Sequence, residues 1–135
     1  MKNLLLDSGV VGAFINRRGD VFDRLQSAVR QGDRIGTCVP IIAEIAYGIE
    51  NSASRDRNFQ ILQRNLSSLR IWPFDLSAAF HYGRIAADLK RRGRPMQVVD
   101  MMVAAVAQTM PIAIVVTTDS DFESIPRLVI ERWQI

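Results

Sequence analysis

The sequence predicts an α/β fold: three layers, α/β/α, around a central, mainly parallel sheet of about five strands. Short β-branched or apolar runs alternate with longer segments whose apolar residues recur every three or four positions. Such alternation is typical of parallel sheets with helices on both faces. The chain has 135 residues, 48% of them hydrophobic, and no segment resembles a linker. We therefore expect one domain over residues 1–135.

The expected strands are short, and the most distinctive is the fourth. Residues 112–116 are almost purely β-branched and apolar, which predicts a strand buried on both faces. The proline in the third segment suggests a strand end or an edge strand. The five segments are residues 4–6, 34–39, 71–74, 112–116 and a last one near 128–133.

The expected helices follow from apolar spacing and from capping residues. Pro40 suits the first turn of a helix, and Asp75 or Ser77 can cap another. Asp7-Ser8-Gly9, after the first strand, signals a loop or a helix cap. Asp100 opens the last helix. The helical segments are residues 22–29, 41–50, 59–69, 79–89 and 101–109.

Acidic residues follow two of the expected strands. Asp7 comes directly after residues 4–6, and Asp119 and Asp121 come directly after the strand at 112–116. The carboxyl ends of parallel strands are where ligand crevices form in such sheets. Taken alone, Asp7 is more simply interpreted as a helix cap, and residues 117–123 as a turn.

Two further acids occur within apolar helices. Glu44 is flanked by apolar residues, and the apolar stripe is too wide to decide whether its side chain faces solvent. A buried Glu44 would need a partner or a metal. Asp100 is the only charge between Arg94 and Asp119, so it begins a helix that we expect to be buried and to face a crevice.

If these acids converge, their chemistry points to a divalent cation. Carboxylates held close together repel one another, and a cation relieves that repulsion. Oxygen ligands favour Mg²⁺ or Mn²⁺ over zinc. His81 and Cys38 are the only residues of their types and supply no zinc set. We expect Cys38 to lie in the core and His81 on a helix surface.

Charge and composition limit the kinds of binding partner and the cellular compartment that we expect for this chain. The formal net charge is +3, and arginines far outnumber the two lysines, Lys2 and Lys90, which suits phosphate recognition. No apolar run approaches a membrane span, and Asp7 interrupts the amino-terminal apolar run too early for a signal peptide. With a single cysteine, these features predict a cytoplasmic protein with no membrane partner.

Four segments, in order, resemble a known family, the PIN-domain endoribonucleases, and within it the VapC-type toxins of type II toxin–antitoxin pairs. Gly9 departs from the pattern, because asparagine is frequent there in the family. The matching segments are Leu-Leu-Leu-Asp-Ser at 4–8, Ile-Ala-Glu-Ile-Ala-Tyr-Gly at 42–48, Gly93-Arg94-Pro95 with Asp100 and Val-Ala-Ala-Val-Ala at 103–107, and Val-Thr-Thr-Asp-Ser-Asp-Phe at 116–122 with Trp133.

The resemblance implies an endoribonuclease that cleaves RNA phosphodiester bonds with metal-activated water, using Mg²⁺ or alternatively Mn²⁺. It makes Asp7, Glu44 and Asp100 an acidic triad, with Asp7 and Asp100 as metal ligands. Asp119 and Asp121 both match the fourth acidic position, and the sequence does not choose between them.

The resemblance also implies partners and substrate contacts. Ser8 would hydrogen-bond an acid or the scissile phosphate. Arg91, Arg92 and Arg94 would guide the RNA backbone, or simply form a solvated surface loop. The family further implies a cognate VapB-type antitoxin that covers the active-site groove, a toxin homodimer, and contact with DNA through the toxin–antitoxin complex.

Two other function classes compete with this hypothesis. A receiver-like phosphoacceptor domain also has acids at strand ends, but it needs a late lysine, and none follows Lys90. A non-catalytic acidic α/β module could instead bind a basic peptide. Nucleotide-binding loops are excluded, because the chain has neither Gly-x-Gly-x-x-Gly nor Gly-Lys-Ser/Thr.

Overall fold

The computed structural model describes residues 1–119 and 121–135, and within them five strands form one sheet. The sheet order is β3-β2-β1-β4-β5, and every neighbouring pair is parallel. The predicted α/β class and parallel sheet are therefore confirmed. The strands are β1 (Asn3–Leu6), β2 (Arg34–Cys38), β3 (Arg70–Trp72), β4 (Ala113–Thr117) and β5 (Ile130–Arg132).

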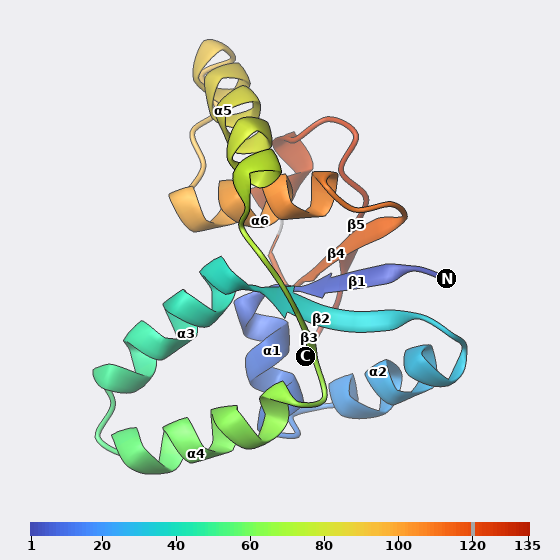
Figure 1. Cartoon of the computed structure of the whole chain (residues 1–135), viewed down its shortest axis with the longest axis vertical. Helices are drawn as coiled ribbons and strands as arrows, with labels where there is room; N and C mark the ends of the chain where they lie inside the picture. The colour runs from blue at the N-terminus through green and yellow to red at the C-terminus, as the bar shows by residue number, and fades with distance from the viewer. Residues whose placement is uncertain (120) are drawn as a thin grey trace.

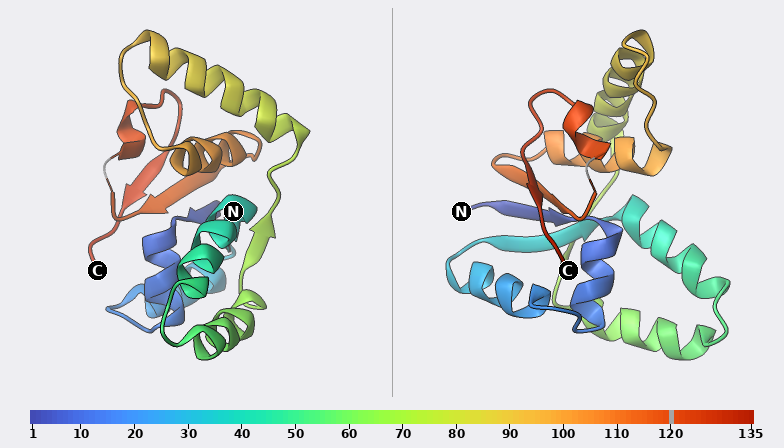
Figure 2. Two further views of the ribbon diagram at one scale, coloured as in Figure 1. Left: turned by 90° about the vertical axis from the view of Figure 1, so that its left-hand side faces the viewer. Right: turned by 180° about the vertical axis from the view of Figure 1, so that it is seen from behind.

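Helices cover both faces of this sheet, as the three-layer prediction requires. Figures 1 and 2 show α1 and α2 on one face and α5 and α6 on the other. In the described part of the chain, no helix is long and apolar enough to cross a membrane. The helices are α1 (Ser8–Ile15), α2 (Val21–Arg30), α3 (Val39–Glu50), α4 (Arg55–Leu66), α5 (Leu76–Arg91), α6 (Val98–Gln108) and the 3₁₀ helix η1 (Asp121–Ser124).

The core forms because the central strand buries side chains on both faces of the sheet. All four residues of β1 are buried, and Leu5 and Leu6 are completely inaccessible to solvent. On α1 they are matched by buried Val10 and Phe14, and α6 contributes a run of buried small and branched residues. Leucine and valine burial of this kind stabilises by about 1.5–3 kcal/mol per side chain.

Glycine is required at one position in the sheet. A Cβ atom on Gly36 would overlap the Arg70 carbonyl oxygen and lie 2.9 Å from Trp72 Cζ3. Since both neighbours belong to the adjacent strand β3, only glycine permits this pairing of β2 with β3.

The structure corrects several sequence-based boundaries. The helix α1 and the 3₁₀ turn η1 were not predicted as helices. The fourth strand begins at Ala113, because Ile112 is exposed and has φ +50°. The helix α4 ends at Leu66, although Leu69 beyond it is still buried. The last long helix begins at Val98, so Asp100 lies inside its first turn.

The strand order fixes where a ligand can bind. In a sheet of order 3-2-1-4-5, the connections run in opposite directions on either side of the β1/β4 pair, and crevices form beyond the carboxyl ends of such strands. At this edge, α3 contacts both α1 and α6, which lie on opposite faces of the sheet. The edge is therefore enclosed by three helices and by the segments that follow β1 and β4.

Candidate active site

Asp7 lies at this edge and is held rigidly. Its side chain caps α1, with Oδ1 accepting a 2.8 Å hydrogen bond from the Ser8 backbone N–H. Its own backbone N–H donates to the Val116 carbonyl of β4. Only 9% of Asp7 is exposed. The helix-cap interpretation is thus correct, and it does not compete with a site role, because the second carboxylate oxygen stays directed toward β4.

That second oxygen is bound by a residue to which the sequence analysis assigned no role. The hydroxyl of Thr117, a completely buried residue, donates to Asp7 Oδ2 over 2.8 Å. The same Thr117 oxygen accepts a bond from the Asp119 backbone N–H, and Asp119 Oδ1 accepts one from the Asp121 N–H. The signal was available: a threonine two residues before an aspartate, at the end of an apolar strand, commonly forms such a turn.

Asp100 reaches the same edge from the first turn of α6. Its side chain is half-buried, and its pKa is raised from 3.8 to about 6, chiefly by burial and then by the charges of Asp7, Asp121, Asp119 and Glu44. The pKa of Asp121 is also raised, mainly by Asp119. The structure therefore brings the five predicted acids into one electrostatic cluster, centred on Asp100.

Glu44 occupies the outer side of this cluster. The sequence left its orientation open, and in the structure it is exposed on α3. No hydrogen bond ties its carboxylate to another residue in the described ranges. Of the four acids that raise the pKa of Asp100, Glu44 contributes least.

The other predicted substrate contacts lie in different environments. Ser8 bonds Asp7 through its backbone N–H. Arg92 forms an ion pair with Asp88 and donates to the Ser124 carbonyl, so it ties the end of α5 to η1. Arg91 is the last residue of α5, and Arg94 is exposed in the following turn.

Cys38 and His81, which the sequence analysis rejected as a zinc-binding set, lie in the core and on a helix, as it predicted. Cys38 is buried at the end of β2, and burial raises the pKa of its thiol to about 11. His81 is half-buried on α5, where its Nδ1 lies 3.1 Å from Gln108 Oε1. Neither residue contributes to the acidic cluster.

The donor chemistry of the cluster fits a hydrated hard cation. Among residues 1–119 and 121–135, no group of three or more Asp, Glu, His or Cys side chains is assembled to hold a metal. Mg²⁺ rarely requires such a cage, since it is commonly held by one or two carboxylates together with waters and substrate phosphates. Asp7 and Asp100 supply such carboxylates at an edge dense in negative charge.

The matching family accounts for nearly the whole chain. The model of the PIN domain family matches residues 4–128. The chain belongs to the PIN-domain family. Within this family its relatives are VapC proteins: it is 30% identical over 134 residues to the "tRNA(fMet)-specific endonuclease VapC" of Shigella flexneri, covering 98% of this chain and 99% of that protein. The protein of the same name from Salmonella typhimurium is 35% identical over 92 residues, 68% of this chain and 70% of that one.

Solved structures agree with this assignment to the VapC-type PIN domains. VapBC2 from Rickettsia felis, bound to a promoter DNA fragment, superimposes with a TM-score of 0.89 at 26% identity, covering 98% of this chain and 99% of that one. The DNA-bound VapBC of Salmonella typhimurium gives 0.88 at 29%, covering 99% and 100%. The resemblance drawn from the sequence motifs is confirmed.

The strand order weighs against the receiver-like alternative. Receiver domains have the flavodoxin-like order 2-1-3-4-5, whereas this PIN domain has 3-2-1-4-5. Strand 2 lies beside strand 1 in both orders, but the other neighbour of strand 1 is strand 3 in a receiver domain and β4 here, so the acids at the carboxyl ends are not equivalent.

Proposed function

We propose that this chain is the endoribonuclease toxin of a toxin–antitoxin pair and that its activity requires Mg²⁺ or Mn²⁺. One observation carries the proposal: the charges of Asp7, Glu44, Asp119 and Asp121 all act on the half-buried Asp100, at the ligand-binding edge of a PIN-domain sheet. The curated relatives, named as ribonucleases or tRNA endonucleases, support RNA as the substrate.

Asp7 and Asp100 are the residues that would hold the cation. When bound, the cation supplies positive charge to a phosphodiester oxygen and lowers the pKa of a coordinated water. Thr117 prepares Asp7 for this role, because its hydroxyl fixes the carboxylate orientation through a 2.8 Å hydrogen bond. The raised pKa of Asp100 reports how unfavourable its negative charge is without a counter-charge.

The remaining acids would act on the attacking water. Glu44 and one of Asp119 and Asp121 are available to orient a water for attack in line with the scissile bond and to accept its proton. Their exposure on the outer side of the cluster suits this task, since water reaches them directly.

The decisive experiment measures RNA cleavage by the purified chain, freed of any co-purifying partner. We expect cleavage of single-stranded RNA in Mg²⁺ or Mn²⁺, none in EDTA, and none by Asp100→Asn. Asp56→Asn is the matched control, because the Asp56 side chain is 90% exposed on α4, its ion pair within the described residues is with Arg55, and it is not among the acids that raise the pKa of Asp100. Cleavage that persists in EDTA, or a fully active Asp100→Asn protein, would contradict the mechanism.

The same protein tests the alternative of a non-catalytic acidic module. Calorimetric titration with Mg²⁺ should show binding by the parent chain and weaker binding by Asp100→Asn. A module that only binds a basic peptide would show neither a site-dependent cation affinity nor cleavage.

Initiator tRNA is the first substrate to try in the cleavage assay, because the Shigella and Salmonella relatives are named as tRNA(fMet)-specific.

We further propose a cognate VapB-type antitoxin, a toxin homodimer, and DNA contact through the toxin–antitoxin complex. The structural relatives from Rickettsia and Salmonella, which are DNA-bound VapBC complexes, support this assembly. Co-expression with a VapB-type antitoxin should yield a stable complex that shifts promoter DNA, whereas the toxin alone should leave the DNA unshifted.

A further inference from the structure

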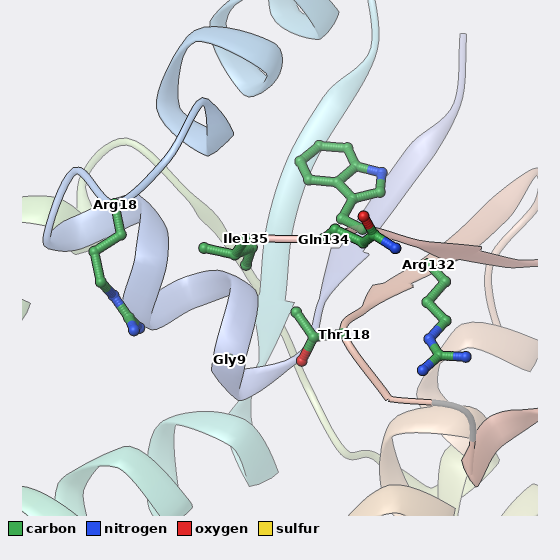
Figure 3. Close-up of a pocket in the computed structure, with 7 residues that line it drawn as sticks. Gly9, Arg18, Thr118, Arg132, Gln134 and Ile135 are labelled. Carbon is green, nitrogen blue, oxygen red and sulfur yellow. The ribbon is translucent and has the colours of Figure 1, made fainter.

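A pocket of about 640 Å³ opens next to the acidic cluster, between α1, the end of β4 and the carboxy-terminal residues (Figure 3). Gly9, which is two residues from Asp7, and Thr118, which precedes Asp119, both line it. The pocket therefore shares its border with the segments that carry two of the site acids. Its volume is in the range of sites that enclose a small ligand or one nucleotide unit.

The lining of this pocket is positive. Its described lining residues include Arg18 and Arg132 and no Asp or Glu side chain. Neither arginine belongs to an ion pair with a described residue, as holds for most arginines of the described chain; what sets these two apart is that both line this pocket. In Figure 3 the two guanidinium groups lie on either side of Thr118. Each of these guanidinium groups can bind an anion such as a phosphate through two parallel hydrogen bonds.

One face of α1 beside the pocket carries glycines instead of larger side chains, and of these Gly9 lines the pocket. Gly9 and Gly12 are three residues apart and so share a face of the helix. A Cβ on Gly9 would lie 3.1 Å from Thr118 Oγ1, and one on Gly12 would lie 3.3 Å from the Arg18 guanidinium. Glycine costs about 1 kcal/mol relative to alanine within a helix. Here the glycine at position 12 leaves room for the Arg18 side chain to lie along α1 toward the acidic cluster.

The pocket is suited to a phosphate backbone rather than to a stacked base. Trp133 is its aromatic residue, but that side chain is 5% exposed and Arg24 covers its ring at 3.7 Å. Its indole N–H is already bound to Glu131. Base stacking needs an open aromatic face, which Trp133 does not provide.

We infer that Arg18 and Arg132 form a phosphate-binding subsite that holds the RNA strand beside the bond to be cleaved. This inference rests on the proposed function, since the anion is taken to be the substrate backbone. The acidic cluster repels RNA, and two arginines at its border supply the opposing attraction. Both are positioning residues: they hold the strand and take no part in the bond-breaking step.

Binding of a fluorescent single-stranded RNA to the Asp100→Asn protein, measured by anisotropy over a range of salt concentrations, tests the subsite. We expect Arg18→Gln and Arg132→Gln each to raise Kd about tenfold and to reduce the salt slope by about 0.7, the value for one lost phosphate contact. Arg64→Gln, which removes the same charge from an exposed arginine on α4, should change neither quantity. Arg18→Lys and Arg132→Lys keep the charge and should recover part of the affinity.

Steady-state cleavage by the otherwise native chain supplies the second readout. Loss of a contact made equally to substrate and transition state raises KM and leaves kcat unchanged, and this split is the expected result for both glutamine variants. Thermal melting midpoints equal to that of the parent confirm that the variants fold.

The outcomes separate the subsite from the proposed function. If the parent cleaves RNA but Arg18→Gln and Arg132→Gln behave like Arg64→Gln, the subsite is overturned and the function stands. If the variants lose affinity for a poly-glutamate peptide but keep their affinity for RNA, the pocket binds an acidic protein segment instead. If the parent neither binds nor cleaves RNA, the proposed function and the subsite fail together.

Discussion

The acidic edge has a fixed side and an open side. On the fixed side, Asp7 is bound to Ser8 and Thr117, is 9% exposed, and is enclosed by β1, β4 and α1. On the open side, Glu44 is exposed on α3 and has no hydrogen-bond partner in the described ranges. Asp100 is half-buried, and the charges of both Asp7 and Glu44 raise its pKa.

This difference shows which part of the site the fold organises in advance. A carboxylate that is held by two hydrogen bonds keeps its geometry whether or not a ligand is present, which is the condition for efficient positioning. An exposed glutamate on a helix gains a defined position only when a cation, water or RNA arrives. Under the proposed function, the fixed side would position the cation and the open side would adapt to the substrate.

The largest effect should separate these two sides directly. We expect Asp7→Asn and Asp100→Asn to lower kcat/KM for RNA cleavage by about 10³-fold or more, and Glu44→Gln by about 30-fold. The reason is that the first two remove the proposed cation ligands, whereas Glu44→Gln removes one of several acids available to orient the attacking water, and Asp119 or Asp121 remains for that task. Equal losses in all three variants, measured on one RNA under single-turnover conditions, would break the distinction.

The next effect tests whether Thr117 is what makes one side fixed. Thr117→Val removes the bond to Asp7, and Thr37→Val removes a similar bond from a buried threonine to the Leu6 carbonyl, 2.7 Å long. Each should lower the free energy of unfolding by about 1–3 kcal/mol. Only Thr117→Val should also lower kcat, by about tenfold. Chemical denaturation and cleavage assays at a temperature where both variants are folded give the comparison.

The pH dependence of the free energy of unfolding tests whether Asp100 is half-buried among the other acids, as the fixed and open sides imply. Its pKa is about 6 in the folded chain and close to its ordinary value of 3.8 when unfolded. Between these values the folded state keeps a proton that the unfolded state has released, so the free energy of unfolding falls as pH rises. Asp100→Asn cannot release a proton, so in this variant the fall in the free energy of unfolding due to residue 100 is absent. Solvent screens a half-buried group, so we expect the variant to melt only about 3 °C above the parent at pH 7 in EDTA.

At pH 4 the two proteins should melt at nearly the same temperature. A constant difference across pH 4 to 7, measured by circular dichroism, would show that Asp100 does not titrate in this range. Addition of Mg²⁺ at pH 7 should stabilise the parent more than Asp100→Asn, because cation binding restores the missing counter-charge.

The smallest expected effect compares Glu44 with the other two exposed acids, Asp119 and Asp121, in how strongly each raises the pKa of Asp100. After burial and Asp7, the raised pKa of Asp100 owes more to Asp121 than to Asp119, and least to Glu44. We therefore expect Asp121→Asn to lower the pKa of Asp100 more than Asp119→Asn does, with Glu44→Gln giving the smallest decrease. Carboxyl-carbon NMR titrations of Asp100 measure this order, and the reverse order would assign the closer position to Asp119.

The sequence was most informative where a predicted apolar strand is followed directly by acidic residues. The parallel sheet follows from the alternation of residues 4–6 and 112–116 with helical patterns, and the acids that follow those strands are brought to one edge because parallel strands end together. The roles of Asp7, Glu44, Asp100, Asp119 and Asp121 nevertheless stay predictions until cleavage is measured.

What the sequence could not supply depends on contacts between distant segments. The bond from Thr117 to Asp7 joins residues 110 positions apart, and the pocket of Arg18 and Arg132 joins the end of α1 to β5. Helix α1 was missed because its eight residues are apolar on nearly all sides, so no periodic stripe marks it. The orientation of Glu44 was undecided for the same reason.

The buried Cys38 has a practical consequence. Because the Cys38 thiol has no exposed surface and burial raises its pKa to about 11, we expect it to stay protonated at neutral pH and not to react with maleimides or methanethiosulfonates. The chain should therefore serve as a cysteine-free background for site-directed labelling. Tyr47→Cys on α3, at a position 72% exposed, would accept a single spin label or fluorophore and report, without further engineering, how that helix moves when cation and RNA are added.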